Sequence, residues 1–258
     1  MNKDLKNHLK ASLEKDVRVD GRNLQDHRDV TIEQGVISTA EGSARVTAGN
    51  AEVLAGVKIE ARQPYPDTPN QGSIQVNVEL LSLSSPEFES GRPGIESIEP
   101  SRVIDRGLRE SGSIDLENLC IKRGEKVYGV VIDIVPINYD GNIYGLGGLA
   151  ALAALKDLTF PALNDDGSID HDTPSQNKTL EHSHKPLPVT VYKVGDLLLV
   201  DPTSEEEAVT DARLTVTVLE DGTICSLQKG GEQPITTSDF KQMVSTAVET
   251  AEELRTQL

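Results

Sequence analysis

Aromatic residues and cysteines are scarce in this chain of 258 residues: tryptophan is absent, aromatic residues make up 3%, and there are two cysteines. Proteins that hold single-stranded nucleic acid by base stacking present several aromatic side chains, so such a stacking platform is not expected here. Cys120 and Cys225 lie far apart and outside any CxxC motif. They indicate reduced, buried residues of an intracellular protein rather than a disulfide framework or a zinc site.

Positive charge is also in deficit, since 25 Lys and Arg residues stand against 42 Asp and Glu residues and give a net charge of -17. A broad positive field, which non-specific binding to nucleic acid or membranes requires, is thereby excluded. The first residues form no apolar signal segment, and the longest apolar stretch, Leu149 to Leu155, is too short to span a bilayer. We expect a soluble, cytoplasmic protein without a membrane partner.

Common catalytic motifs are missing as well, because the sequence contains no P-loop, GxGxxG, GxSxG or HExxH. Three glycines, at 145, 147 and 148, could approach a phosphate, but close packing explains them about as well. The acidic run Asp201 to Glu207, with Asp211, could bind a divalent metal, although adjacent acids are more often solvated turns. His182-Ser183-His184 lies in a polar segment without further ligands, which favours a solvated loop.

The elements that are present follow from apolar periodicity. Leu5, Leu9 and Leu13 predict an amphipathic helix. The run after Asp140-Gly141-Asn142 predicts a helix whose body, 149–156, is apolar on all sides and therefore buried. Strands are predicted at 35–39, 44–48, 52–60, 73–80, 126–136, 189–194, 197–200, 214–219 and 223–227. The last helix, entered at Ser238, carries Phe240, Val244, Ala247, Val248, Ala251 and Leu254 on one face.

Strands followed by a helix occur twice in this order. This pattern predicts an α+β fold of two similar halves, about 17–160 and 188–258, joined by a polar linker over 163–188. The halves together make one domain over residues 1–258.

Three arginines lie close together in the segment Ser101 to Arg109 of the first half. On a helix, Arg102, Arg106 and Arg109 share one stripe, while Ile104 and Leu108 lie opposite and can face a core. Such a stripe is a candidate phosphate contact, because guanidinium groups bind phosphate oxygens bidentately. The alternative is a salt-bridged surface, since Asp105 is four residues before Arg109 and Arg106 is four before Glu110.

Together these segments resemble the ribonuclease PH family, from about Val17 to the end of the chain. Within that family the sequence is most similar to the non-catalytic ring subunit of the archaeal RNA exosome. The resemblance is carried by Asp20-Gly21-Arg22, the strand meander, Ile98 to Arg109, Asp133-Ile134-Val135 and Asp140-Gly141-Asn142.

That resemblance implies a fold of two pseudo-repeated halves with strands flanked by helices. It also implies a hexameric ring, in which this subunit alternates with a homologous catalytic one, and cap proteins with RNA-binding domains. The family degrades RNA from its 3′ end with inorganic phosphate. Phosphate and magnesium would be used by the catalytic partner, and this chain would need no cofactor.

Two departures from the active pattern concern the phosphorolytic site. Active members carry two aspartates six residues apart in a segment two residues longer than 201–211, and a hydroxyl-rich loop before the second helix. This chain has Glu205 six before Asp211, and its loop reads Asn142-Ile143-Tyr144-Gly145. The resemblance therefore implies no catalytic residues and no metal ligands here. It places Arg102 and Arg106, with Arg109 as a weaker candidate, in an RNA-binding cleft shared with the neighbour.

Two other functions stay open at this point. One is an active phosphate-dependent 3′–5′ exoribonuclease of the ribonuclease PH type. The other is a small-molecule enzyme or metal-binding protein that uses Asp201 to Asp211.

Overall fold

Two β-sheets of unequal size organise the chain in the computed structural model, which describes residues 3–89, 91–164, 167–175, 180 and 183–256. Within these residues the large sheet has the strand order β1-β2-β3-β6-β4, and β5 pairs with one end of β6. Strand β4 runs parallel to β6, and the other pairs are antiparallel. The bounds are β1 Val30–Gln34, β2 Gly42–Ala48, β3 Ala51–Arg62, β4 Ser73–Val78, β5 Cys120–Lys122 and β6 Lys126–Asn138.

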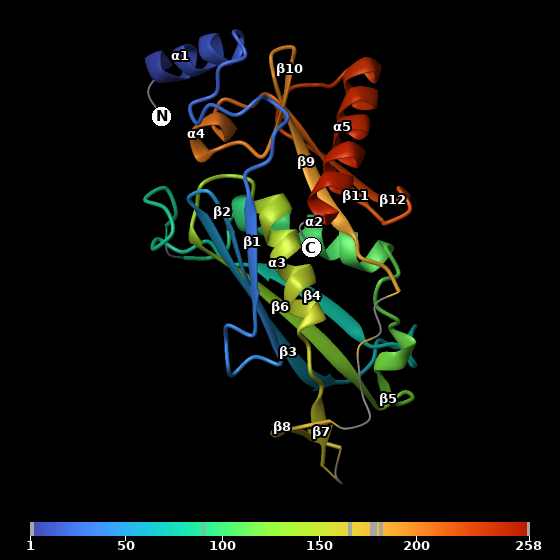
Figure 1. Cartoon of the computed structure of the whole chain (residues 1–258). Helices are drawn as coiled ribbons and strands as arrows, with labels where there is room; N and C mark the ends of the chain where they lie inside the picture. The colour runs from blue at the N-terminus through green and yellow to red at the C-terminus, as the bar shows by residue number, and fades with distance from the viewer. Residues whose placement is uncertain (1–2, 90, 165–166, 176–179, 181–182, 257–258) are drawn as a thin grey trace.

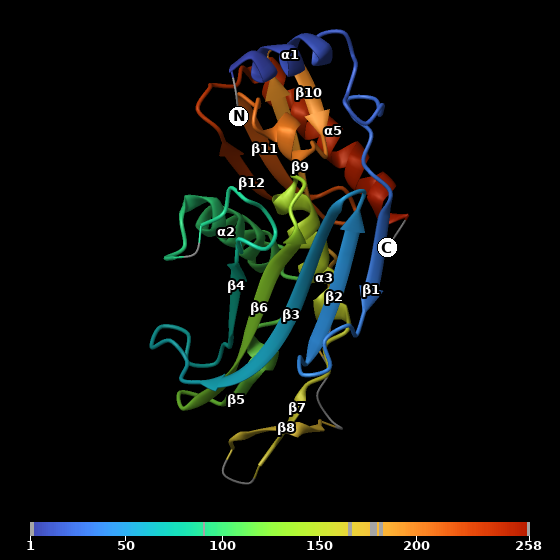
Figure 2. The same cartoon turned by 90° about the vertical axis from the view of Figure 1, so that its left-hand side faces the viewer.

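The small sheet belongs to the second half and is antiparallel, in the order β10-β9-β11-β12. Its strands are β9 Leu187–Val194, β10 Leu197–Val200, β11 Ala212–Val218 and β12 Ile224–Gly230. A separate hairpin of β7 (Pro161–Leu163) and β8 (Ile169–Pro174) projects beyond the end of the large sheet in both views (Figures 1 and 2).

Helix α3 (Ile143–Lys156) lies between the two sheets and contacts β2, β3 and β9 (Figure 1). Every residue from Ile143 to Leu155 is buried, which explains why this helix is apolar on all sides. A Cβ atom on Gly148 would lie 2.2 Å from Cγ of Pro188 on β9. Gly148 thus serves close packing between the halves, whereas Gly145 and Gly147 face residues of the first half.

The other helices pack on one sheet or on both. Helix α1 (Lys3–Leu13) packs Leu9 and Leu13 against the small sheet, and α5 (Thr237–Arg255) contacts β9 and β11. Helix α2 (Ile95–Glu110) contacts β4 and β12. Two short turns complete the set, the 3₁₀ turn Glu117–Leu119 and α4 (Ser204–Glu207). No helix in the described part of the chain is long and apolar enough to cross a membrane.

The α+β fold class predicted from the sequence is confirmed, and so are the predicted strands at β2, β3, β4 and β6 and the buried central helix. Strand β5 was not predicted. Asp133, the polar exception in β6, accepts a hydrogen bond from Asn77 on the neighbouring strand β4. Its carboxylate is therefore paired within the sheet.

Four details of the prediction are wrong. The first strand is Val30–Gln34 rather than 35–39, because Gly35 takes a left-handed φ of 67° and ends it. Part of the predicted linker, 169–174, pairs as β8.

The last helix begins after Thr236, which caps it in a capping box with Asp239, and not at Ser238. Met243 is buried on its inner face, whereas Phe240, predicted for that face, is exposed. Both cysteines are free but only half-buried.

Replacement of Gly148 by Ala tests the packing of α3 against the small sheet. The new methyl group would overlap the ring of Pro188, and we expect the free energy of unfolding to fall by about 1–3 kcal/mol in urea titrations. Gly91→Ala is the matched control, because a Cβ there meets nothing within 4 Å. Equal stability of the two variants would show that the halves do not depend on this contact.

Candidate functional site

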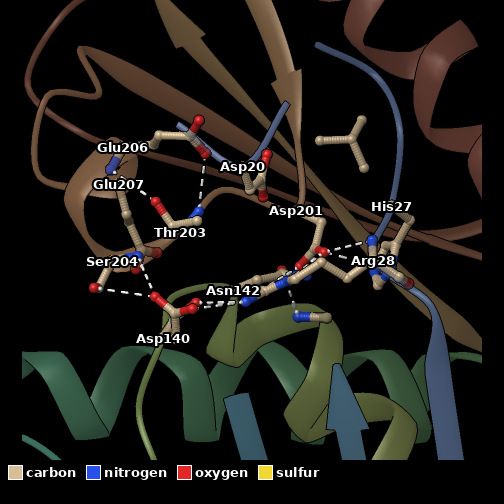
Figure 3. A network of polar contacts seen from close by, with 12 residues as sticks. Asp20, His27, Arg28, Asp140, Asn142, Asp201, Thr203, Ser204, Glu206 and Glu207 are labelled. Carbon is tan, nitrogen blue, oxygen red and sulfur yellow. Dashed lines mark hydrogen bonds and ion pairs between the residues drawn. The ribbon is translucent and has the colours of Figure 1, made fainter. Parts of the chain in front are cut away.

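A buried carboxylate, Asp201, ties the N-terminal segment to the start of α3 (Figure 3). It accepts hydrogen bonds from Nε and Nη2 of Arg28, both at 2.7 Å, and from Nδ2 of Asn142 at 2.8 Å. The backbone N–H of Arg28 and Nη1 of Arg22 donate to it as well, at 2.9 and 3.2 Å. Asp201 has a left-handed φ of 47°, a backbone strain that this set of partners holds in place.

A second buried ion pair joins Arg18 to Glu206, and both side chains are fully buried. Nη2 of Arg18 donates to Oε2 of Glu206 at 2.6 Å, and Nε donates to Oε1 at 3.0 Å. The Arg18 guanidinium also donates to the carbonyls of Val200 and Asp201. The carboxylates of Asp201 and Glu206 are thus saturated by arginines. The part of the chain that the structure describes contains no group of three or more His, Cys, Asp or Glu residues suited to a metal ion.

These contacts set the protonation of Asp201. Burial by itself raises the pKa of this carboxyl, but the hydrogen bonds and charge of Arg28 outweigh burial and hold the pKa well below its ordinary value of 3.8. The folded chain therefore releases this proton more readily than the unfolded chain. The stabilisation is fully present above the ordinary value and is lost as the pH falls below it.

Asp201→Asn should lower the free energy of unfolding by about 3–5 kcal/mol at neutral pH, because it leaves buried guanidinium groups without their counter-charge. It should also flatten the decline of stability below the ordinary pKa of 3.8. Urea titrations from pH 3 to pH 7 measure both effects. Asp196→Asn, at an exposed position, is the control. If the stability of the Asp201 variant declined with falling pH as steeply as that of the unmodified chain, Asp201 would not be the group responsible for the decline.

The three predicted arginines line one groove of about 500 Å³ along α2. Val103, Ile104 and Leu108 are buried on the inner side of the helix, which leaves the arginines exposed on the outer side. We call this surface the arginine groove; it is lined by Ile95, Ile98, Glu99, Arg102, Val103, Asp105, Arg106, Arg109, Glu110 and Gln228.

The arginines differ in their partners. Arg109 binds Asp105 at 2.9 Å and donates to the carbonyl of Ile74, so the salt-bridged surface predicted as the alternative holds for this residue. Arg106 donates to Oε1 of Gln228 at 3.4 Å instead of pairing with Glu110. Arg102 forms no hydrogen bond or ion pair with any other described residue. Two of the three guanidinium groups therefore keep donors available to a ligand.

Residues of the loop before α3 (142–145) and of the acidic run (201–207) line a second hollow of about 800 Å³. We call it the carboxylate cavity; it is lined by Leu5, Leu80, Ser84, Ser85, Pro86, Glu87, Phe88, Ile95, Glu96, Glu99, Asn138, Tyr139, Ile143, Tyr144, Ser204, Glu205, Glu207, Ala208 and Arg213. The first turn of α3 presents Ile143 and Tyr144 to it, and α4 presents Glu205 and Glu207. Residues of the loop before α3 and of the acidic run, among them Tyr144 and Glu205, thus lie on one surface.

Polar groups in this cavity bind one another. Glu207 accepts hydrogen bonds from the hydroxyls of Tyr139 and Tyr192, and burial raises the pKa of its carboxyl. Arg213 lies over the ring of Tyr144, 4.7 Å from its centroid, donates to its hydroxyl at 2.6 Å, and binds Glu99 at 2.6 Å. The one guanidinium among the lining residues is therefore neutralised.

Glu205 and Asp211, the two acids at the family's spacing, serve different surfaces. Glu205 is exposed at the cavity rim, whereas Asp211 is absent from its lining. Asp211 instead accepts hydrogen bonds from Lys10 of α1 and from the backbone N–H of Gly195 in the β9–β10 turn. His184 lies 3.9 Å from Glu220, and His182 lies outside the described residues.

Sequence reasoning missed Gln228, Arg213 and Glu99 as members of these surfaces. Gln228 and Arg213 come from strands more than a hundred residues away from α2, and no local motif marks them. Arg18 and Arg28 were also missed as ion-pair partners, because their acids lie in the other half of the chain.

Comparison with known proteins identifies the family. Residues 26–161 match the model of the 3′ exoribonuclease family, domain 1, and residues 184–250 match that of domain 2. The chain belongs to the 3′ exoribonuclease family. The ribonuclease PH-like fold inferred from the sequence is thereby confirmed.

Relatives of this 3′ exoribonuclease-family chain are named as exosome subunits. Exosome complex component Rrp42 of Methanothermobacter thermautotrophicus is 46% identical over 238 residues, 92% of this chain and 88% of the relative. The protein of the same name in Thermoplasma acidophilum is 42% identical, with 97% and 93% covered. The resemblance to an archaeal exosome subunit is confirmed.

Solved structures give the same result. A chain of the Archaeoglobus fulgidus exosome with RNA bound to the active site superposes with a TM-score of 0.91 at 39% identity, covering 98% of this chain and 97% of that one. A chain of an archaeal exosome core gives 0.85 at 37% identity, with 97% and 94% covered. Rice Rrp46, at 17% identity and a TM-score of 0.68, shares the fold.

Proposed function

We propose that the chain is the non-catalytic subunit of an archaeal exosome ring and that it supports 3′-to-5′ phosphorolytic RNA degradation by a homologous catalytic neighbour. The observation that carries this proposal is the contrast between its two hollows. The turn where the family would bind phosphate, at the start of α3, presents Ile143 and Tyr144, and the guanidinium among the cavity's lining residues, Arg213, is bound to Glu99. The arginine groove beside it presents guanidinium groups with free donors.

Phosphate binding at the start of α3 is disfavoured on physical grounds. A phosphate dianion needs hydroxyl or cationic donors, and this turn offers Ile143 and Tyr144. The Tyr144 hydroxyl already accepts a hydrogen bond from Arg213. Glu99 and Glu207 add negative charge nearby. An isolated chain of this kind lacks both the phosphate cradle and the paired aspartates of active members.

The arginine groove supplies what the neighbour would need. RNA carries one negative charge per nucleotide, and the protein's own charge of -17 opposes its approach. Exposed guanidinium groups at Arg102 and Arg106 neutralise phosphates locally and hold them bidentately. Arg109, bound to Asp105, contributes less. The cleft is complete only when the neighbouring subunit supplies the catalytic groups.

The partners under this proposal are a homologous catalytic subunit in an alternating hexamer, cap proteins with RNA-binding domains, and RNA. The complex would act in the cytoplasm, with phosphate and magnesium used at the neighbour's site. The alternative of an independently active exoribonuclease would require phosphate binding in the carboxylate cavity, which its lining opposes.

The isolated chain should release no nucleoside diphosphates from labelled RNA in the presence of magnesium and phosphate. The physical reason is the absence of a phosphate cradle and of two aspartates on one surface. Thin-layer separation of the products measures this, and the same chain mixed with the catalytic subunit is the positive control. Diphosphate release by a preparation free of that subunit would support the independently active enzyme.

Arg102→Ala with Arg106→Ala should leave folding and ring assembly intact but weaken RNA binding by the whole ring. The slope of log affinity against log salt should fall by about 0.7 for each phosphate of single-stranded RNA that the ring no longer neutralises. RNA decay by the neighbour should slow, and Arg→Lys should rescue it only in part, because an ammonium lacks the bidentate fork.

Lys6→Ala with Lys241→Ala is the matched control, since it removes the same charge from exposed positions outside the groove. Arg109→Ala alone should have a smaller effect than Arg102→Ala alone or Arg106→Ala alone. If an assembled ring with Arg102 and Arg106 replaced kept the unmodified decay rate and salt slope, the outer side of α2 would be an ordinary solvated surface.

A further inference from the structure

Helix α2 is held to the edge of the large sheet at two points. Strand β4 ends the strand order of that sheet, and the N–H of Glu79, just after it, donates to the carbonyl of Ile134 on β6. Because successive N–H groups of an extended chain point to opposite sides, the N–H of Val78 points away from β6. It donates to Oγ of Ser101 on α2 at 2.8 Å. The helix therefore binds a backbone group on the outer edge of the sheet.

The second contact lies at the other end of the arginine stripe. Nη2 of Arg109 donates to the carbonyl of Ile74 on β4 at 3.0 Å. The two strand partners are four residues apart, about 13 Å, and the two helix partners are eight residues apart, about 12 Å. The two contacts therefore have matching spacing on the strand and on the helix, and α2 runs antiparallel to β4 between them.

The guanidinium of Arg109 is already engaged on the side that would grip a phosphate. Its Nε donates to Oδ2 of Asp105 at 3.2 Å and its Nη2 donates to Oδ1 at 2.9 Å. Bidentate binding of a phosphate uses the same kind of parallel N–H pair. Arg109 is thus bound to an acid on its own helix and to the backbone of the neighbouring strand.

The start of α2 depends on an anchor outside the helix. Gly94, which precedes it, supplies no side-chain cap, and Pro100 has no N–H to close a helical bond to the carbonyl of Glu96. The hydroxyl of Ser101 donates to the carbonyl of Ser97 at 2.6 Å while it accepts the bond from β4. One side chain thus ties the first turns of α2 together and joins them to the sheet.

Arg102 and Arg106 lie between the two contacts. A helix turns by about 100° per residue, so a rotation of α2 on β4 by that amount would carry both guanidinium groups away from the groove. We propose that Ser101 and Arg109 are positioning residues, which fix the direction of Arg102 and Arg106 toward RNA, and that Arg109 itself binds no phosphate. This inference rests on the proposed function.

The test is whether the effects on RNA binding by the assembled ring are additive. Arg109→Ala and Ser101→Ala should each raise the dissociation constant for single-stranded RNA at least about threefold in an otherwise unmodified ring. In a ring that already carries Arg102→Ala and Arg106→Ala, each should raise it less than about twofold and leave the salt slope unchanged, because the groups that they position are gone.

Two further variants sharpen the measurement. Ser101→Thr keeps the hydroxyl and should restore most of the affinity that Ser101→Ala loses. Arg45→Ala is the matched control and should leave RNA binding unchanged, since Arg45 has nearly the same side-chain exposure as Arg109, 42% against 43%, and is also bound to an acid. Light scattering checks the mass of each ring first. Ser101→Ala removes no charge, so it tests the proposal even where the loss of Arg109 disturbs assembly.

The outcomes separate this inference from the proposed function. If Arg109→Ala weakens binding by the same factor in both rings and lowers the salt slope by about 0.7, Arg109 binds a phosphate itself and the positioning role is overturned. The role is also overturned, while the proposed function stands, if only Arg102→Ala with Arg106→Ala weakens binding, or if Ser101→Thr binds as weakly as Ser101→Ala. If Arg102→Ala with Arg106→Ala has no effect, both proposals fail.

Discussion

One buried carboxylate holds the architecture of the site together. Asp201 neutralises Arg28 and Arg22, which come from the segment before the first strand, and binds the side chain of Asn142, which caps α3. Unpaired guanidinium groups at these positions would be costly, because burial removes their hydration. The N-terminal segment, the first turn of α3 and the acidic run can therefore occupy only one arrangement relative to one another.

That arrangement also determines which groups the start of α3 presents to the carboxylate cavity. Asn142 takes a left-handed backbone conformation and accepts a hydrogen bond from the N–H of Gly145, so the loop before α3 is closed on itself. The N-terminus of a helix is ordinarily a good site for anions. Here that tendency is offset by the apolar and phenolic side chains of the first turn and by the carboxylates of α4. The start of α3 therefore offers an anion little beyond its backbone N–H groups.

Local patterns sufficed for much of this picture. The alternation in Ser73–Val78 and the all-apolar run in α3 each follow from one burial pattern. Helical spacing placed the three arginines on one stripe of α2, and the resemblance suggested their role. The first strand was misplaced because Gly35 looked like a strand start, although its left-handed backbone makes it a strand end. The partners of the arginines could not be predicted. Gln228 and Glu206 reach them only through the packing of one half on the other, which leaves no periodic signal in a single sequence.

The position of α3 also bears on how the chain folds. This helix belongs by sequence to the first half, yet the strand β9 of the second half covers one of its sides, with Pro188 seated on Gly148. A first half released alone from the ribosome would expose an apolar helix with no polar face, which favours collapse into aggregates. The two halves should therefore gain their stability in a single cooperative transition, and a cut between them would yield two insoluble fragments rather than two small domains.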